Sequence, residues 1–78
     1  MNKILLVDDE KNILEGYRRN LTEYFDITSA DSGDAAIAML KEEGPFRVIV
    51  SDYKMPNMNG VELLKKAREI SPDTIQIM

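Results

Sequence analysis

The sequence predicts an α/β fold in which helices flank a parallel β-sheet. Residues 4–7 and 48–50 are continuously apolar rather than alternating, which is typical of strands buried on both faces of a parallel sheet. Stretches with helical periodicity alternate with strand-like stretches along the whole chain in the order β-α-β-α-β-α-β. This alternation indicates βαβ units joined by right-handed crossovers.

The first half of the chain predicts two strands and two helices. Residues 4–7 form the first strand, and a helix begins at Lys11. Residues 25–30 form a shorter and more polar strand, typical of a sheet edge. Ser32 is expected to cap the second helix, which ends at Gly44-Pro45. The apolar stripe of the first helix consists of Ile13, Leu14, Tyr17, Leu21 and Tyr24.

The second half predicts a buried strand, a capped helix and a last strand. Residues 48–50 form the third strand. Asn59 is expected to cap the third helix, with Glu62 in the capping-box position, and Ser71-Pro72 ends that helix. Residues 74–78 resemble a fourth strand. We expect one domain over residues 1–78 with a modest core.

Composition narrows the classes of function. The chain has 14 Asp and Glu against 10 Lys and Arg, which argues against binding nucleic acid through its phosphates. It contains no cysteine, so disulfides and thiolate metal sites are excluded and a reducing compartment fits. No apolar stretch is long enough for a signal peptide or a membrane span. We expect a soluble, cytoplasmic protein.

Three acidic residues follow two strands of the predicted sheet. Asp8 and Asp9 come directly after the first strand, and Asp52 follows the third. In a doubly wound sheet these strands are often neighbours, and a crevice opens at their carboxyl ends. Three carboxylates in one crevice repel one another, and a Mg²⁺ ion, which prefers oxygen ligands, relieves that repulsion. The pattern predicts metal-assisted phosphoryl chemistry, with Asp52 as the nucleophile that forms an aspartyl phosphate.

Each part of this pattern also has a purely structural explanation. The acids at residues 8–10 are suited to capping the first helix and to interacting with its dipole. Asp52 alone is also a common turn residue. The functional interpretation is favoured by the combination, in which acids end both strands and Met55-Pro56 and Gly60 follow Asp52 at set distances.

The segments ILLVDDE at residues 4–10 and DYKMPNMNG at residues 52–60 resemble the receiver domain of response regulators, the phosphoacceptor module of two-component signalling. The resemblance extends over the whole chain. It implies a flavodoxin-like (CheY-like) doubly wound sheet with strand order 2-1-3-4-5, of which this chain holds the incomplete order 2-1-3-4. It also implies that Pro56 and Gly60 shape the loop after Asp52.

The same resemblance assigns roles to the acids. Asp52 accepts a phosphoryl group from a phosphohistidine on a sensor kinase or phosphotransfer protein. Asp9 and Asp52 ligate Mg²⁺ directly together with the backbone carbonyl of Lys54, and Asp8 holds a metal-bound water. The side chain of Lys54 lies where receivers tune the lifetime of the phosphoryl group.

The resemblance also implies residues that these 78 residues do not contain. Receivers carry a Thr or Ser after the fourth strand and a Lys after the fifth, and the sequence ends at Met78. We therefore expect a truncated receiver with impaired phosphotransfer. The fourth strand is then an open edge with Ile75, Ile77 and Met78 partly uncovered. This predicts a two-fold homodimer through that strand, with the fourth strands paired antiparallel or a segment swapped.

Two other functions remain open at this point. The chain is alternatively an interaction module that dimerises or binds partners without phosphorylation. It also compares with aspartyl-nucleophile phosphatases of the haloacid-dehalogenase kind, which carry a second acid two residues after the nucleophile. Lys54 occupies that position here, so we expect a signalling domain rather than an enzyme.

Overall fold

The computed structural model, which describes residues 2–78, contains four strands and three helices in the predicted alternating order. The strands are β1 (Lys3–Val7), β2 (Asp26–Ala30), β3 (Val48–Ser51) and β4 (Ile75–Ile77), and the helices are α1 (Lys11–Leu21), α2 (Gly33–Glu43) and α3 (Gly60–Ile70). Within residues 2–78, no helix combines the length and the apolar character that crossing a bilayer requires.

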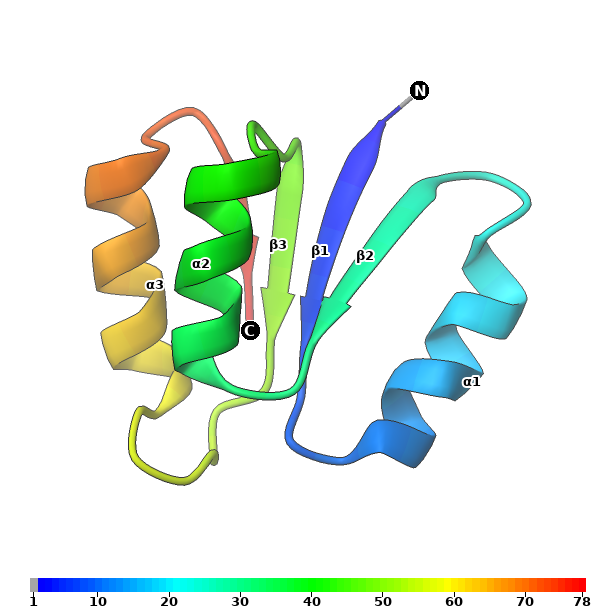
Figure 1. Cartoon of the computed structure of the whole chain (residues 1–78), viewed down its shortest axis with the longest axis horizontal. Helices are drawn as coiled ribbons and strands as arrows, with labels where there is room; N and C mark the ends of the chain where they lie inside the picture. The colour runs from blue at the N-terminus through cyan, green and yellow to red at the C-terminus, as the bar shows by residue number, and fades with distance from the viewer. Residues whose placement is uncertain (1) are drawn as a thin grey trace.

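The four strands form one parallel sheet in the order β2-β1-β3-β4, which confirms the predicted order 2-1-3-4 (Figure 1). Ile4 of β1 lies beside Ile27 of β2 and Val48 of β3. The chain enters at β1 in the middle of the sheet, adds β2 on one side, and then crosses to β3 and β4 on the other side. The switch in direction therefore lies between β1 and β3, the two strands that the acids follow.

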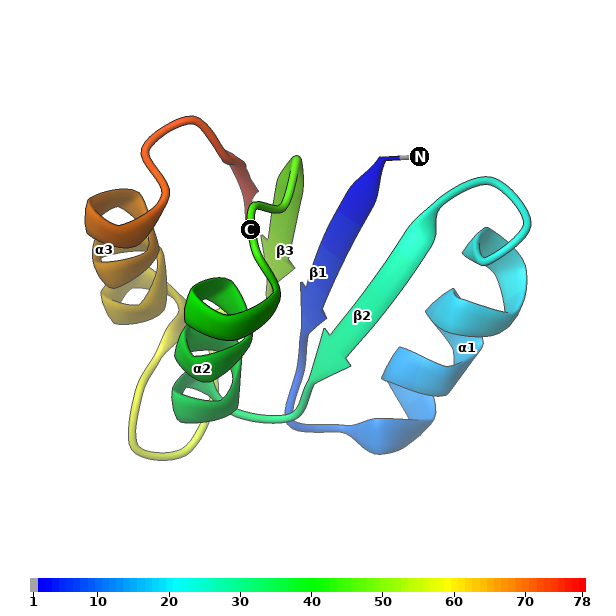
Figure 2. The same cartoon turned by 45° about the horizontal axis from the view of Figure 1, so that its top comes forward.

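Helices cover both faces of the sheet, with α1 on one side and α2 and α3 on the other (Figure 2). Because side chains alternate along a strand, Leu5 and Ile49 face α2 and α3, whereas Leu6 and Ile27 face Leu14 of α1. The larger of the two apolar clusters lies on the side of α2 and α3, and its largest fully buried side chains are Leu5, Ile49 and Leu63.

Side-chain caps begin two of the helices, as predicted. The Ser32 hydroxyl accepts a hydrogen bond from the Ala35 amide at 3.1 Å, and the Asn59 side-chain oxygen accepts one from the Glu62 amide at 2.9 Å. Each cap satisfies an amide that has no partner inside its helix. The Asn59 cap fixes where α3 starts, and so fixes the end of the loop that follows Asp52.

The apolar stripe predicted for the first helix was too long, since it extended past the end of α1 to Tyr24. Helix α1 ends at Leu21, whose carbonyl accepts hydrogen bonds from the amides of Tyr24 and Phe25, both at 3.0 Å. This turn places Tyr24 outside the helix with 69% of its surface exposed, and Tyr17 is also half exposed.

The last strand is shorter than the predicted residues 74–78, because β4 covers only Ile75–Ile77. Thr74 lies before the strand, where its hydroxyl donates to the Phe46 carbonyl at 2.7 Å.

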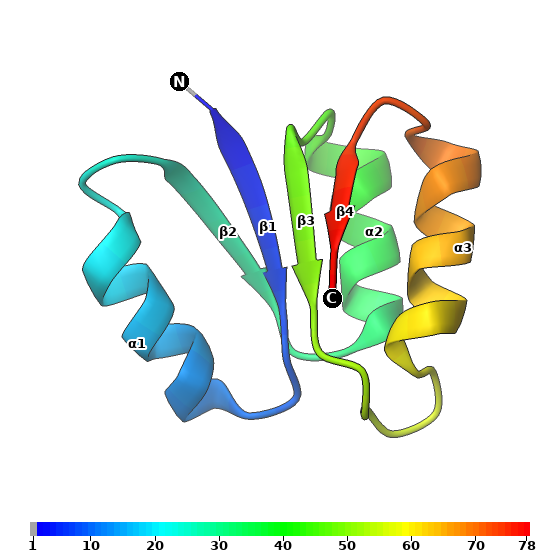
Figure 3. The ribbon, with the colours of Figure 1, turned by 180° about the vertical axis from the view of Figure 1, so that it is seen from behind.

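One half of the sheet face that carries α1 remains uncovered in the described part of the chain (Figure 3). Helix α1 packs on β1 and β2. The register places Ile75 beside Val48 and Ile77 beside Val50 on this face, and Ile75 and Ile77 are 54% and 49% exposed. On the opposite face, the Gln76 side chain donates to the Leu64 carbonyl of α3 at 2.7 Å.

We predict that Leu63→Ala destabilises the fold by about 2–5 kcal/mol, because Leu63 is fully buried and its truncation leaves a cavity between α3 and the sheet. Urea denaturation followed by circular dichroism measures the effect. Val61→Ala is the matched control in the same helix, since Val61 is 39% exposed, and we expect it to cost less than about 1 kcal/mol. Equal losses in the two variants would contradict this account of the core.

Candidate functional site

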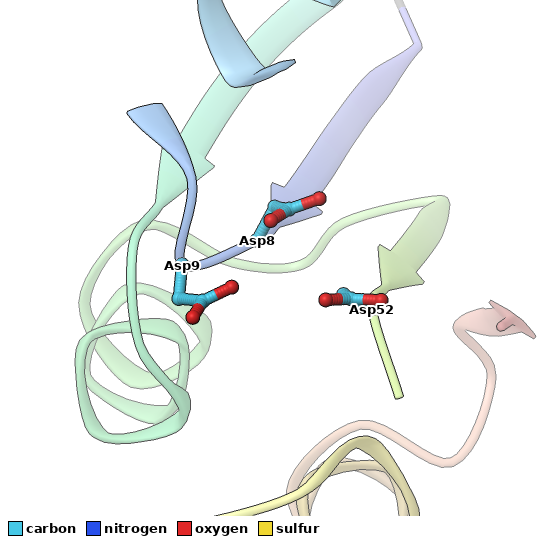
Figure 4. Close-up of side chains that lie close together, drawn as sticks. All are labelled: Asp8, Asp9 and Asp52. Atoms are coloured by element: carbon cyan, nitrogen blue, oxygen red, sulfur yellow. The ribbon is translucent and has the colours of Figure 1, made fainter. Parts of the chain in front are cut away.

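The structure brings Asp8, Asp9 and Asp52 together at the carboxyl edge of the sheet (Figure 4). One carboxylate oxygen from each residue lies within 4.8 Å of the others. The cause is the topology, since β1 and β3 are hydrogen-bonded neighbours in which Val7 lies beside Ser51. The residues that directly follow two adjacent parallel strands must therefore lie side by side.

Backbone hydrogen bonds hold the first residue after each strand in place. The Asp52 amide donates to the Val7 carbonyl at 2.9 Å, and the Asp8 amide donates to the Ala30 carbonyl at 3.2 Å. These bonds extend the sheet ladder by one residue beyond β3 and β1. The backbone of Asp8 and of Asp52 is therefore held in place by the same kind of hydrogen bond that joins the strands.

Two of the carboxylates also accept hydrogen bonds from nearby backbone amides. Oδ1 of Asp52 accepts from the Tyr53 amide at 2.9 Å, and Oδ1 of Asp8 accepts from the Glu10 amide at 2.9 Å. Asp8 is half-buried, whereas Asp9 and Asp52 are exposed. A large partner can therefore reach Asp52 directly, while Asp8 lies deeper.

The donor set fits a hard divalent cation. All three candidate ligands are carboxylate oxygens, which suit Mg²⁺ better than a soft metal. Ligand oxygens around one Mg²⁺ lie roughly 3–4 Å apart, so small rotations of these side chains bring them into range of one ion. Lys54 lies in the loop after Asp52, and the predicted role of its backbone carbonyl remains a prediction.

Gly60 lets the loop return close to Asp52. The Gly60 amide donates to the Tyr53 carbonyl at 2.8 Å. A β-carbon on Gly60 would lie 2.5 Å from the Asp52 carbonyl oxygen, closer than real contacts allow, and a tight 3.1 Å from the Tyr53 α-carbon. Asn57 takes the left-handed conformation, with a φ of 70°, so that the loop can turn. The predicted loop-shaping role of Gly60 thus has a steric basis.

Two buried methionines anchor this loop to the apolar core. Met55 and Met58 are 9% and 7% exposed and belong to the core cluster under α2 and α3. A β-carbon on Gly33, the first residue of α2, would lie 2.6 Å from the Met58 sulfur. This contact is not predictable from the sequence alone, because neither residue carries a local signal that the two meet.

Two neighbours of Asp52 had no role in the sequence analysis. Ser51 is buried, and its hydroxyl donates to the Asp52 carbonyl at 3.0 Å, so it supports the backbone of the site. Tyr53 is 53% exposed. It helps to line an open hollow of about 390 Å³ beside the acids, whose lining residues are Asp9, Tyr53, Lys54, Met55, Pro56 and Asn59.

Known proteins are similar to this chain in both sequence and fold. The family model of the response regulator receiver domain matches residues 4–78. The response regulator receiver protein CpdR of Brucella abortus is 36% identical over 74 residues, which cover 94% of this chain and 61% of CpdR.

Two solved structures are similar in fold as well. A Rhodopirellula baltica chain described as an adenylate cyclase has a TM-score of 0.94 at 44% identity, over 97% of this chain and 57% of that one. Vibrio cholerae chemotaxis protein CheY4 has a TM-score of 0.90 at 32% identity, over 97% of this chain and 65% of that one. The chain thus spans about 60% of the length of these relatives.

We predict that Gly60→Ala lowers the free energy of unfolding by about 1–3 kcal/mol, because the added methyl group forces the Asp52 carbonyl out of position. Gly16→Ala is the control, since a β-carbon there meets nothing within 4 Å. Inside α1 that substitution should stabilise the chain by roughly 0.5–1 kcal/mol. Chemical denaturation of both variants measures the two opposite signs, and a loss of stability from both would contradict the steric argument.

Proposed function

Because the chain belongs to the response regulator receiver domain family, we propose that it is a phosphoacceptor of a two-component phosphorelay, phosphorylated on Asp52 by a histidine kinase or a phosphotransfer protein. The observation that carries this proposal is the convergence of three carboxylates, within 4.8 Å of one another, at the ends of adjacent parallel strands. We also propose that residues 1–78 belong to one partial receiver domain and that the chain acts in the cytoplasm.

The proposed step is an attack of the Asp52 carboxylate on the phosphorus of a phosphohistidine. An O–P bond forms, and the P–N bond breaks with its electron pair remaining on the imidazole nitrogen. Since the Tyr53 amide already holds Oδ1 of Asp52, we expect Oδ2 to be the attacking oxygen. The exposure of Asp52 supports its assignment over Asp8, which is half-buried.

We propose that Asp9, Asp52 and the Lys54 carbonyl hold Mg²⁺, with Asp8 bound to it through a water. When bound, the ion offsets the negative charge of the carboxylates and of the incoming phosphoryl group. Asp8 and Asp52 keep their orientation through the amides of Glu10 and Tyr53. The Thr or Ser and the Lys of the family pattern lie outside these 78 residues, so we expect slow transfer in this chain.

We predict that this chain, incubated with Mg²⁺ and acetyl phosphate, slowly gains the mass of one phosphoryl group, and that Asp52→Asn abolishes the gain because the nucleophile is removed. Intact mass spectrometry over a time course makes the measurement. Asp73→Asn is the matched control, because Asp73 is exposed at the opposite edge of the sheet, where β1 begins. Labelling that persists in Asp52→Asn would contradict the assignment of the acceptor.

Further assays on the same sample distinguish the phosphoacceptor from the two other candidate functions, a phosphatase and an interaction module. A phosphatase would hydrolyse a phosphomonoester repeatedly, whereas a receiver releases no appreciable phosphate from it. The Lys at position 54, where such a phosphatase carries an acid, supports the signalling function. A wild-type chain that neither gains mass nor responds to beryllofluoride in NMR spectra would instead indicate an interaction module that works without phosphorylation.

We further propose a homodimer formed through β4. Within residues 2–78, β4 lies at the edge of the sheet, so its outer backbone groups face no other described strand and can pair with a strand of another chain. Its Ile75 and Ile77 side chains are half exposed beside Val48 and Val50. Antiparallel pairing of two β4 strands about a two-fold axis is the simplest closed arrangement.

We predict that the chain elutes as a dimer in size-exclusion chromatography with light scattering, and that Ile77→Glu shifts it toward monomer by placing a charge at the interface. Tyr24→Glu is the control, since Tyr24 is 69% exposed and precedes β2 at the other sheet edge. A folded wild-type monomer at high concentration would exclude the dimer.

A further inference from the structure

Tyr53 is an aromatic residue whose backbone is held beside the acids by two hydrogen bonds. Its amide donates to Oδ1 of Asp52 at 2.9 Å, and its carbonyl accepts from the Gly60 amide at 2.8 Å. Both ends of this residue's backbone are therefore fixed, although 53% of its surface is exposed. The exposed ring therefore extends from a fixed point of the backbone beside the acids, where a flat group can stack on it.

The hollow next to Tyr53 adjoins the site of the proposed transfer. It measures about 390 Å³, and Asp9 belongs both to its lining and to the acid trio. In an in-line transfer the leaving group lies on the side of the phosphorus away from the attacking oxygen. Such a group needs open space near Asp52, and this hollow lies next to it through Asp9, whose carboxylate is within 4.8 Å of that of Asp52.

We propose, on the premise that Asp52 is the phosphoacceptor, that Tyr53 is a specificity-determining residue that stacks on the imidazole ring of a phosphohistidine donor. A flat heteroaromatic ring gains stacking energy against a tyrosine, and a protonated imidazole adds a cation–π attraction. A carboxylate leaving group gains neither contribution, so Tyr53 favours donors whose leaving group is an aromatic ring.

The transfer balances with either kind of donor. With a phosphoimidazole protonated on its second nitrogen, Asp52 forms the O–P bond while the P–N bond breaks. The electron pair of that bond stays on nitrogen, and neutral imidazole leaves. With an acyl phosphate, the P–O bond to the acyl oxygen breaks and a carboxylate leaves. Tyr53 takes part in neither bond change, so its effect is confined to recognition of the leaving group.

The test compares two small donors, monophosphoimidazole and acetyl phosphate, on the full 78-residue chain with Mg²⁺. The initial rates of labelling at Asp52 are measured for the wild type, Tyr53→Ala and Tyr53→Phe. We expect Tyr53→Ala to lower the ratio of the phosphoimidazole rate to the acetyl phosphate rate by about 2- to 10-fold. Tyr53→Phe keeps the ring and should keep the wild-type ratio. An unchanged ratio in Tyr53→Ala, or an equal fall in Tyr53→Phe, overturns the proposal.

A second measurement needs no phosphoryl transfer. Imidazole is titrated into ¹⁵N-labelled chain, and the shifts of the Asp9, Lys54 and Asn59 amides report its binding, with acetate as the control ligand. The imidazole affinity should fall about 2- to 10-fold in Tyr53→Ala and remain in Tyr53→Phe.

The two measurements also distinguish this proposal from the proposed function. If the wild type is labelled at Asp52 but neither the rate ratio nor the titration depends on Tyr53, the role of Tyr53 is overturned and the phosphoacceptor stands. If labelling fails while imidazole binding still depends on Tyr53, the phosphoacceptor is overturned and recognition of the ring stands.

Discussion

The pairing of β1 with β3 is the constraint on which the rest of this structure depends. These two strands are not consecutive in the chain, yet they lie side by side at the centre of the sheet. Just beyond the ends of these strands, the Asp52 amide donates to the Val7 carbonyl at 2.9 Å. This hydrogen bond sets the distance between the backbone of Asp52 and that of Asp8 and Asp9. A change of register between these strands would separate Asp52 from Asp8 and Asp9, and would also exchange the side chains that face each helix layer.

Placing three carboxylates together opposes folding, and the site limits that cost in two ways. Asp9 and Asp52 are exposed, so water and salt screen the repulsion between them. Backbone amides of Tyr53 and Glu10 donate to Asp52 and Asp8, so one oxygen of each of these carboxylates has a hydrogen-bond partner within the fold. The remaining repulsion favours binding of a cation, so the arrangement that opposes folding is the same one that favours the proposed chemistry.

Local and periodic signals predicted most of the fold. The continuous apolar runs at residues 4–7 and 48–50 predicted the central strands, and Ser32 and Asn59 predicted two helix starts, because each signal acts within a few residues. Tyr24 was misplaced, because the turn at Leu21 competes with the helical pattern. The contact of Gly33 with Met58 joins distant segments, and a single sequence carries no pattern for such a contact. The site acids were predicted as neighbours because strand topology, not side-chain packing, brings them together.

The close fit of Met58 against Gly33 has an evolutionary consequence. The Met58 side chain, in the loop that follows Asp52, packs against Gly33, the first residue of α2. Gly33 has no β-carbon, which leaves room for the Met58 sulfur. Side-chain volume at position 58 therefore limits which residues position 33 can accept, although 25 positions separate them in the chain. Among descendants of this sequence, these two positions should change as a pair, a small residue at one permitting a larger residue at the other.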